Sequence, residues 1–156
     1  MAVVLLAAGP SGGAQPGSAA REPVVVTADG MEAEKLGDKV RFTGNVTLKK
    51  EEMTLSSDSM TVFYDAGSKV IRRIDARGNV MVRKEGRVAF ANRASYYSRD
   101  EKIILTGNAR IIENDNQLGG KRITLFMRDD RSIVEGGRVL LYQEQPVSPS
   151  GGARRR

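Results

Sequence analysis

A short motif that recurs along the chain places the strongest constraint on its fold. Residues 42–48 read FTGNVTL, and related segments occupy residues 76–82 (ARGNVMV) and 105–111 (LTGNARI). A weaker fourth copy occupies residues 135–141 (EGGRVLL). The motif glycines at positions 44, 78, 107 and 137 are 34, 29 and 30 residues apart. A repeat of this period is typical of a chain built from stacked supersecondary units.

Each unit also contains a second recurring segment. Residues 58–64 (DSMTVFY), 92–97 (NRASYY) and 121–126 (KRITLF) match one another, and residues 29–33 (DGMEA) match more weakly. Each unit therefore consists of two extended segments, one with a Gly-Asn step and one that begins with a polar residue. An ordinary β protein with similar turns is the alternative, but three matches in the same register favour a true repeat.

Apolar and polar side chains alternate within these segments. Val40, Phe42, Val46 and Leu48 share one side of an extended chain, and polar residues lie between them. No stretch shows the spacing of an amphipathic helix, and clusters of turn-forming residues recur every 8–12 residues. This pattern predicts an antiparallel all-β fold.

The motif glycines lie inside the alternating runs and not between them. A glycine inside a strand indicates a bend, a bulge or the close approach of another backbone. Each of Gly44, Gly78 and Gly107 is followed by asparagine, which tolerates unusual backbone dihedrals. We therefore expect corners within strands at these positions, not two-residue hairpin turns.

The composition excludes several kinds of chemistry. The 156 residues suit one domain, and the chain contains neither cysteine nor histidine. Disulfides, thiolate chemistry, zinc sites with nitrogen or sulfur ligands and histidine-dependent triads are therefore excluded. We expect no metal ion and no cofactor. The net charge of +6 includes the three arginines at positions 154–156, so the remainder is only mildly basic.

Catalysis and nucleic-acid binding are poorly supported by the remaining residues. Acidic side chains that could pair for glycoside hydrolysis are Asp58, Asp65, Asp75, Asp100, Asp129 and Asp130. Asp129 and Asp130 lie between Arg128 and Arg131, which is typical of a solvated charge cluster. Aromatic residues make up 5% of the chain and do not interleave with Lys and Arg along the sequence. We expect neither an enzyme nor a nucleic-acid binder.

The two ends differ in composition from the centre. Residues 1–8 are apolar but too few to cross a membrane, and residues 9–20 are rich in Gly, Ala and Pro. Ser18 and Ala20 suit a signal-peptidase cut before Arg21, although a basic start is missing. We interpret residues 1–22 as the remainder of an export signal that begins upstream of Met1, or as a flexible arm. Residues 23–142 form the expected domain, and residues 143–156 a disordered basic tail.

Several segments together resemble the OstA-like family. These are residues 28–33 (ADGMEA), 40–48 (VRFTGNVTL) and 55–60 (LSSDSM), together with the later copies of the Gly-Asn motif. A single Gly-Asn-Val is weak, but four units in order over residues 23–142 are specific. The resemblance implies an open-ended, taco-like β-jellyroll in the periplasm whose apolar interior holds the lipid A acyl chains of lipopolysaccharide. It also implies head-to-tail strand addition, to further copies and to LptC-like inner-membrane and LptD-like outer-membrane partners.

The alternation, read with this resemblance, gives a candidate lipid-binding site and candidate assembly edges. We expect the interior to be lined by Met31, Phe42, Val46, Met60, Val62, Val80, Phe90, Ala94, Tyr96, Leu105, Ile123 and Leu125. We expect the assembly edges to contain Val24, Val25, Val26, Val139 and Leu141. The alternative is that the interior residues only pack against one another, in a lipid-free structural or scaffolding β-repeat protein of the cell envelope.

Overall fold

The computed structural model describes residues 5–6, 23–34 and 38–141. All regular elements in these ranges are β-strands, which confirms the predicted antiparallel all-β fold. In these ranges no helix has the length and apolar character needed to span a membrane. The expected export segment (except the backbone of Leu5–Leu6), Tyr142 and the expected basic tail lie outside the described residues.

The strands form one antiparallel sheet of eleven. They are β1 (Leu5–Leu6), β2 (Val25–Thr27), β3 (Gly30–Ala33), β4 (Lys39–Lys50), β5 (Met53–Tyr64), β6 (Ile71–Lys84), β7 (Arg87–Tyr97), β8 (Lys102–Glu113), β9 (Asn116–Phe126), β10 (Arg131–Glu135) and β11 (Arg138–Leu140). Strands β4 to β9 pair consecutively, as in a meander. Both β2 and β3 pair with β4, and both β10 and β11 pair with β9.

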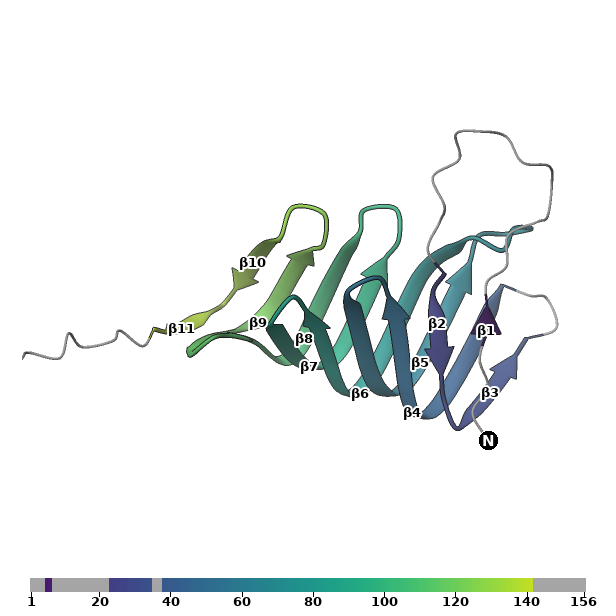
Figure 1. Cartoon of the computed structure of the whole chain (residues 1–156), viewed down its shortest axis with the longest axis horizontal. Helices are drawn as coiled ribbons and strands as arrows, with labels where there is room; N and C mark the ends of the chain where they lie inside the picture. Colours follow the sequence, from purple (N-terminus) through teal and green to yellow (C-terminus); the bar gives the residue numbers. More distant parts are fainter. Residues whose placement is uncertain (1–4, 7–22, 35–37, 142–156) are drawn as a thin grey trace, which may run out of the picture.

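The long strands bend near their middles, so the sheet has two arms (Figure 1). Arm 1 contains β3, β10 and residues 39–43, 59–64, 71–77, 93–97, 102–106 and 122–126. Arm 2 contains β2, β11 and residues 46–50, 53–57, 80–84, 87–91, 109–113 and 116–120. The strand register shifts between the arms in every pairing from β4 to β9.

The bends occur at the Gly-Asn steps, as the sequence predicts. Gly44 and Asn45, Gly78 and Asn79, and Gly107 and Asn108 all have positive φ. Two successive residues in this left-handed region bend the strand, and its pairing with the neighbouring strands resumes on the other side of the bend. Glycine adopts this conformation without steric cost, and asparagine with little.

A polar side chain from the preceding unit covers each corner glycine. The Asp58 carboxylate accepts a hydrogen bond of 2.9 Å from Asn79 Nδ2, and Asp58 would also contact a Cβ placed on Gly78. Asp29 bonds Asn45 Nδ2 at 2.9 Å and covers Gly44 in the same way. The two halves of the repeat therefore recur together because each second segment supplies the residue that covers the next glycine.

The fourth corner corrects the alignment of the weakest repeat. Gly136, and not Gly137, has positive φ and lies against the Lys121 side chain. The step from Gly107 is therefore 29 residues, equal to the preceding one. The alignment was ambiguous because two glycines are adjacent and no asparagine follows them.

The inward faces of both arms form the core. Buried apolar side chains on arm 1 include Phe42, Met60, Ile74, Ile103 and Ile123, and those on arm 2 include Leu48, Leu55, Val80 and Ile111. The opposite face of each arm carries the polar members of the alternating pattern. The fold therefore buries one face of a single sheet against another part of the same sheet.

The contact between a corner glycine and its covering side chain can be tested at Gly107. A Cβ at this position would lie 2.8 Å from Asn92 Cβ, and φ is +76°. Gly67→Ala is the matched control, because Gly67 has φ +70° in a turn with open space around it. We expect Gly67→Ala to cost about 1–2 kcal/mol for the left-handed backbone. Gly107→Ala should cost ~1–3 kcal/mol more for the clash in chemical denaturation, and equal losses would contradict the role of the covering residue.

Candidate functional site

Ten of the twelve residues predicted to line the interior are buried between the arms. They are at most 8% exposed: Phe42, Val46, Met60, Val62, Val80, Ala94, Tyr96, Leu105, Ile123 and Leu125. They come from all six long strands, so the inward face is continuous from β4 to β9. The same face contains buried residues outside the predicted set, including Leu48, Ile74, Val82, Ile103 and Ile111.

Phe90 is not part of the interior. Its ring lies on the outer face of arm 2 under the guanidinium of Arg110, whose Cζ is 4.9 Å from the ring centroid. The inward residues of this part of β7 are Ala89 and Ala91. In β7 the inward side chains have odd numbers before the corner (Ala89, Ala91) and even numbers after it (Ala94, Tyr96). The alternation on one side of the corner therefore does not predict the inward residues on the other side.

Met31 points to the inward side but is not enclosed. It pairs with the buried Phe42 across β3 and β4, so the two side chains share one face of the sheet. Among the described residues no strand lies beyond β3, and Met31 is 41% exposed. Met31 therefore marks the open end of the interior at this edge.

The interior has almost no polar groups. Ser57 is the one polar side chain that is buried among the described residues, and its Oγ donates to the carbonyl of Ser59 at 3.0 Å across the corner of β5. Five buried alanines (Ala76, Ala89, Ala91, Ala94 and Ala109) give the middle of the interior short side chains. Such a lining is suited to contact with apolar groups.

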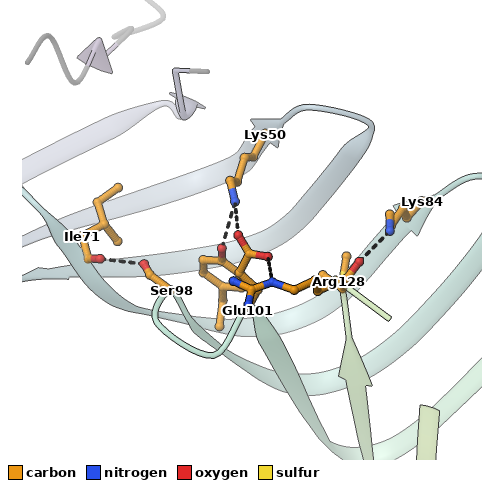
Figure 2. A network of polar contacts seen from close by, with 8 residues as sticks. Lys50, Ile71, Lys84, Ser98, Glu101 and Arg128 are labelled. Carbon is orange, nitrogen blue, oxygen red and sulfur yellow. Dashed lines mark hydrogen bonds and ion pairs between the residues drawn. The ribbon is translucent and has the colours of Figure 1, made fainter. Parts of the chain in front are cut away.

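The free ends of the arms meet along a polar seam, which we define by Lys50, Lys84, Tyr96, Glu101 and Asp130. Figure 2 shows Lys50, Glu101 and Lys84 of this seam. Lys50 Nζ lies 3.2 Å from the Tyr96 hydroxyl and 3.7 Å from Glu101. Lys84 Nζ donates to Asp130 Oδ1 and to the Met127 carbonyl, both at 2.9 Å. Side-chain contacts therefore join the ends of the arms at the seam.

The seam contacts change the proton affinities of their members. Burial lowers the pKa of Lys50, but the hydrogen bond to Tyr96 and the nearby acidic groups outweigh it, so its pKa is raised overall. The hydrogen bond from Lys84, with the charges of Lys84 and Arg87, lowers the pKa of the Asp130 carboxyl. Both shifts favour the charged forms that hold the seam together.

A hollow of about 810 Å³ opens beside the seam. Its apolar wall includes Val24, Ile71, Ile74 and Tyr96, and Lys50 and Glu101 lie at its polar side. A second hollow of about 50 Å³ lies beneath Lys84 and reaches Ala89 and Ile111. The seam therefore lies where the surface gives access to residues of the interior.

The two candidate assembly edges differ. Val139 pairs with Leu118 at the edge of arm 2 and is 50% exposed, and Leu141 is 71% exposed. At the other edge, Val25 and Val26 of β2 pair with Leu6 and Leu5 of β1, and Val26 is buried. Val25 and Val26 of the predicted edge are therefore already covered by a segment of the same chain, whereas in the described part of the chain no strand covers the free side of Val139.

Comparison with known protein families identifies the architecture. Residues 25–131 match the family described as LptA/(LptD N-terminal domain) LPS transport protein. The chain belongs to this family. The family is described as one of lipopolysaccharide transport proteins.

Individual relatives agree with this membership. The chain is 25% identical over 116 residues to the lipopolysaccharide export system protein LptA of Escherichia coli K12, covering 70% of this chain and 63% of LptA. It is 30% identical over 128 residues to an uncharacterised protein of Rhizobium meliloti, covering 76% of this chain and 69% of that protein. The chain thus spans less than two thirds of the length of LptA.

A solved structure confirms the expected β-jellyroll of this family. The chain superimposes on LptH of Pseudomonas aeruginosa with a TM-score of 0.71 and 13% sequence identity, covering 78% of this chain and 96% of LptH. LptH is described as the LptA-homologous periplasmic component of the lipopolysaccharide transport device of that organism.

The seam can be tested through the pKa of Asp130. Because its folded pKa is lowered, ionised Asp130 stabilises the fold at neutral pH, and this contribution disappears as the pH falls through that pKa. We expect Lys84→Met to raise the carboxyl pKa toward its ordinary value of about 3.9, as measured by NMR titration. Lys49→Met, which removes an exposed lysine one residue before the seam, should leave it unchanged. An unchanged pKa in Lys84→Met would contradict the contact.

Proposed function

We propose that this chain is a periplasmic carrier that moves lipopolysaccharide from the inner to the outer membrane, with the acyl chains held between the two arms. The observation that supports this most strongly is the continuous apolar face shared by β4 to β9 on both arms. A carrier of a lipid with several acyl chains needs such a face, since each CH₂ group exposed to water costs about 0.8 kcal/mol.

The shape of the fold suits a guest that passes through the protein. Among the described strands none at the β4 end of the sheet pairs with β10 or β11 at the other end, so the two ends of the sheet stay apart. Met31 at one end and Val139 at the other are apolar and partly exposed on or beside the inward face. An acyl chain could therefore pass from one copy to the next without leaving an apolar surface.

The seam provides a way to enlarge the interior. The ends of the arms are joined there by the side chains of Lys50 and Lys84, and not by strand pairing. The arms can separate at the seam while every strand keeps its neighbours. Gly44, Gly78 and Gly107 at the bends of β4, β6 and β8 give the backbone conformational freedom where the arms meet. Acyl chains would then replace contacts that the side chains make with one another.

The uncovered edge supports head-to-tail assembly by strand addition. An exposed apolar edge strand such as that at Val139 is a template for a strand from another chain. At the opposite edge Leu5 and Leu6 already pair with β2 as an antiparallel strand, so a strand from another chain would take the place of this segment. We propose that further copies, LptC-like inner-membrane partners and LptD-like outer-membrane partners add at these edges, with residues 23–142 as the assembling domain.

The close packing of the interior favours a second candidate function. Phe42, Ile103, Leu105 and Ile123 have essentially no solvent exposure, so the arms need no guest to bury them. A lipid-free structural or scaffolding protein of the cell envelope would have the same packing. The two functions differ in whether lipid reaches the inward side chains.

Site-specific photo-crosslinking in cells tests the carrier function. A photoreactive amino acid at Met60 or Leu105, which are inward and buried, should give adducts with lipopolysaccharide on irradiation. Phe90 is the matched control, because it lies in the same sheet but faces outward under Arg110. Adducts at the inward positions and not at Phe90 would support the carrier, whereas no adduct at any inward position would favour the scaffold.

Analytical ultracentrifugation tests the proposed assembly. The average mass of the chain should rise with concentration from that of a 17.0 kDa monomer. Val139→Lys should suppress this rise, because a lysine on an edge strand opposes strand addition. Val70→Lys is the control, since Val70 is similarly exposed but lies in the turn between β5 and β6. A strict monomer at all concentrations would contradict assembly through this edge.

A further inference from the structure

The outer face of arm 1 carries a row of alternating cationic and aromatic side chains that the sequence does not reveal. Direct cross-strand partners place the row in the order Lys39, Phe63, Arg73, Tyr97, Lys102, Phe126 and Arg131. The row crosses seven strands, so it is roughly 29 Å long at ~4.8 Å per strand. Lys, Arg and aromatic residues therefore interleave in space although they do not along the chain.

The cations in this row cover the rings. The guanidinium Cζ of Arg73 is 4.5 Å from the Phe63 ring centroid, and that of Arg131 is 4.4 Å from the Phe126 centroid. Lys102 Nζ lies 5.5 Å from the ring of Tyr97. Nucleic-acid bases need open ring faces for stacking, so this face is poorly suited to binding single strands. It presents positive charge along an apolar support.

A second row on the same face contains like charges directly opposite each other. Arg77 pairs with Arg93 across β6 and β7, and Arg122 follows across Thr106 in the same row. Arg122 approaches Glu135 at 3.9 Å, but among the described residues no ion pair forms at Arg77 or Arg93. Like charges directly opposite in a sheet are destabilising. Their cost is offset if an anion lies over this face.

The acidic residues near this face do not neutralise it. Three cations of the first row have acidic partners. Lys39 pairs with Glu34 at 2.6 Å, Arg73 with Asp75 at 3.0 Å and Lys102 with Asp100 at 3.2 Å. Arg77, Arg93 and Arg131 have no such partner among the described residues, and Ile133 is exposed beside Arg131 on β10. The face thus combines unpaired cations with an exposed apolar side chain, a combination found where proteins lie on a membrane surface.

From this geometry we propose that the outer face of arm 1 binds the surface of a bilayer rich in anionic phospholipid. The cations are spread over several strands, so they match many headgroups better than one phosphate. Arg77 and Arg93 supply the electrostatic attraction, and the row from Lys39 to Arg131 lies against the interface. This contact is independent of the interior, because inward and outward side chains lie on opposite faces of the sheet.

Vesicle co-sedimentation of the full chain tests this proposal. Binding should be strong to vesicles of phosphatidylcholine with phosphatidylglycerol, weak to phosphatidylcholine alone, and reduced by salt. Arg77→Gln with Arg93→Gln should lower the partition coefficient roughly thirtyfold, which corresponds to about 1 kcal/mol for each basic residue near an anionic surface. The fold should persist, because both side chains are exposed.

A matched double variant separates the face from the net charge. Lys49→Gln with Arg83→Gln removes two exposed charges from the outer face of arm 2 and should have a much smaller effect. Equal losses in the two double variants, or no binding of the unmodified chain, would overturn the proposal. Equal binding to a single-stranded oligonucleotide would overturn its assignment to a membrane. Because these vesicles contain no lipopolysaccharide, failure here leaves the crosslinking result unaffected.

Discussion

The fold depends on the contact between a corner glycine and a polar side chain from the preceding unit. Asp58 covers Gly78 and accepts a hydrogen bond from Asn79, and the same arrangement recurs with Asp29 at Gly44. This contact fixes where each strand bends, and the bends lie side by side because adjacent strands are paired. Without these bends an antiparallel sheet of this sequence would leave its apolar face exposed to water. The corner therefore converts a one-sided sheet into a structure with an interior.

Much of this architecture could be predicted from the sequence, because local patterns specify it. The alternation identified the strands, and the Gly-Asn steps identified corners in β4, β6 and β8. In these strands the inward side chains keep the same odd or even numbering on both sides of the corner, as Phe42 and Val46 do. In β7 it changes between Ala91 and Ala94, and no glycine marks the change. The alternation therefore predicts an inward Phe90, whereas its ring lies on the outer face.

Other features could not be predicted because they depend on the register of strands far apart in sequence. Lys50 meets Glu101 only because the arms face each other, and their positions in the chain give no sign of this contact. Arg77 and Arg93 become neighbours through the register of β6 and β7. Interior residues follow from periodicity along one strand, whereas the seam and the outer rows follow from the arrangement of several. The sequence pattern is therefore most informative about the interior and least about the surfaces.

The packed interior and the polar seam together determine how a carrier of this kind would behave. Separating the arms of an empty protein would expose Leu105, Ile103 and their neighbours to water, at ~25 cal/mol for each Å² of apolar surface. The seam adds the contacts of Lys50 and Lys84, which are partly exposed and contribute little beside that area. An acyl chain that enters keeps the apolar surface of the interior out of water. It therefore offsets the cost of exposing that surface, and only the seam contacts have to be broken. On this basis the arms would stay closed without lipid and open only as lipid enters, which reconciles a tightly packed core with transport.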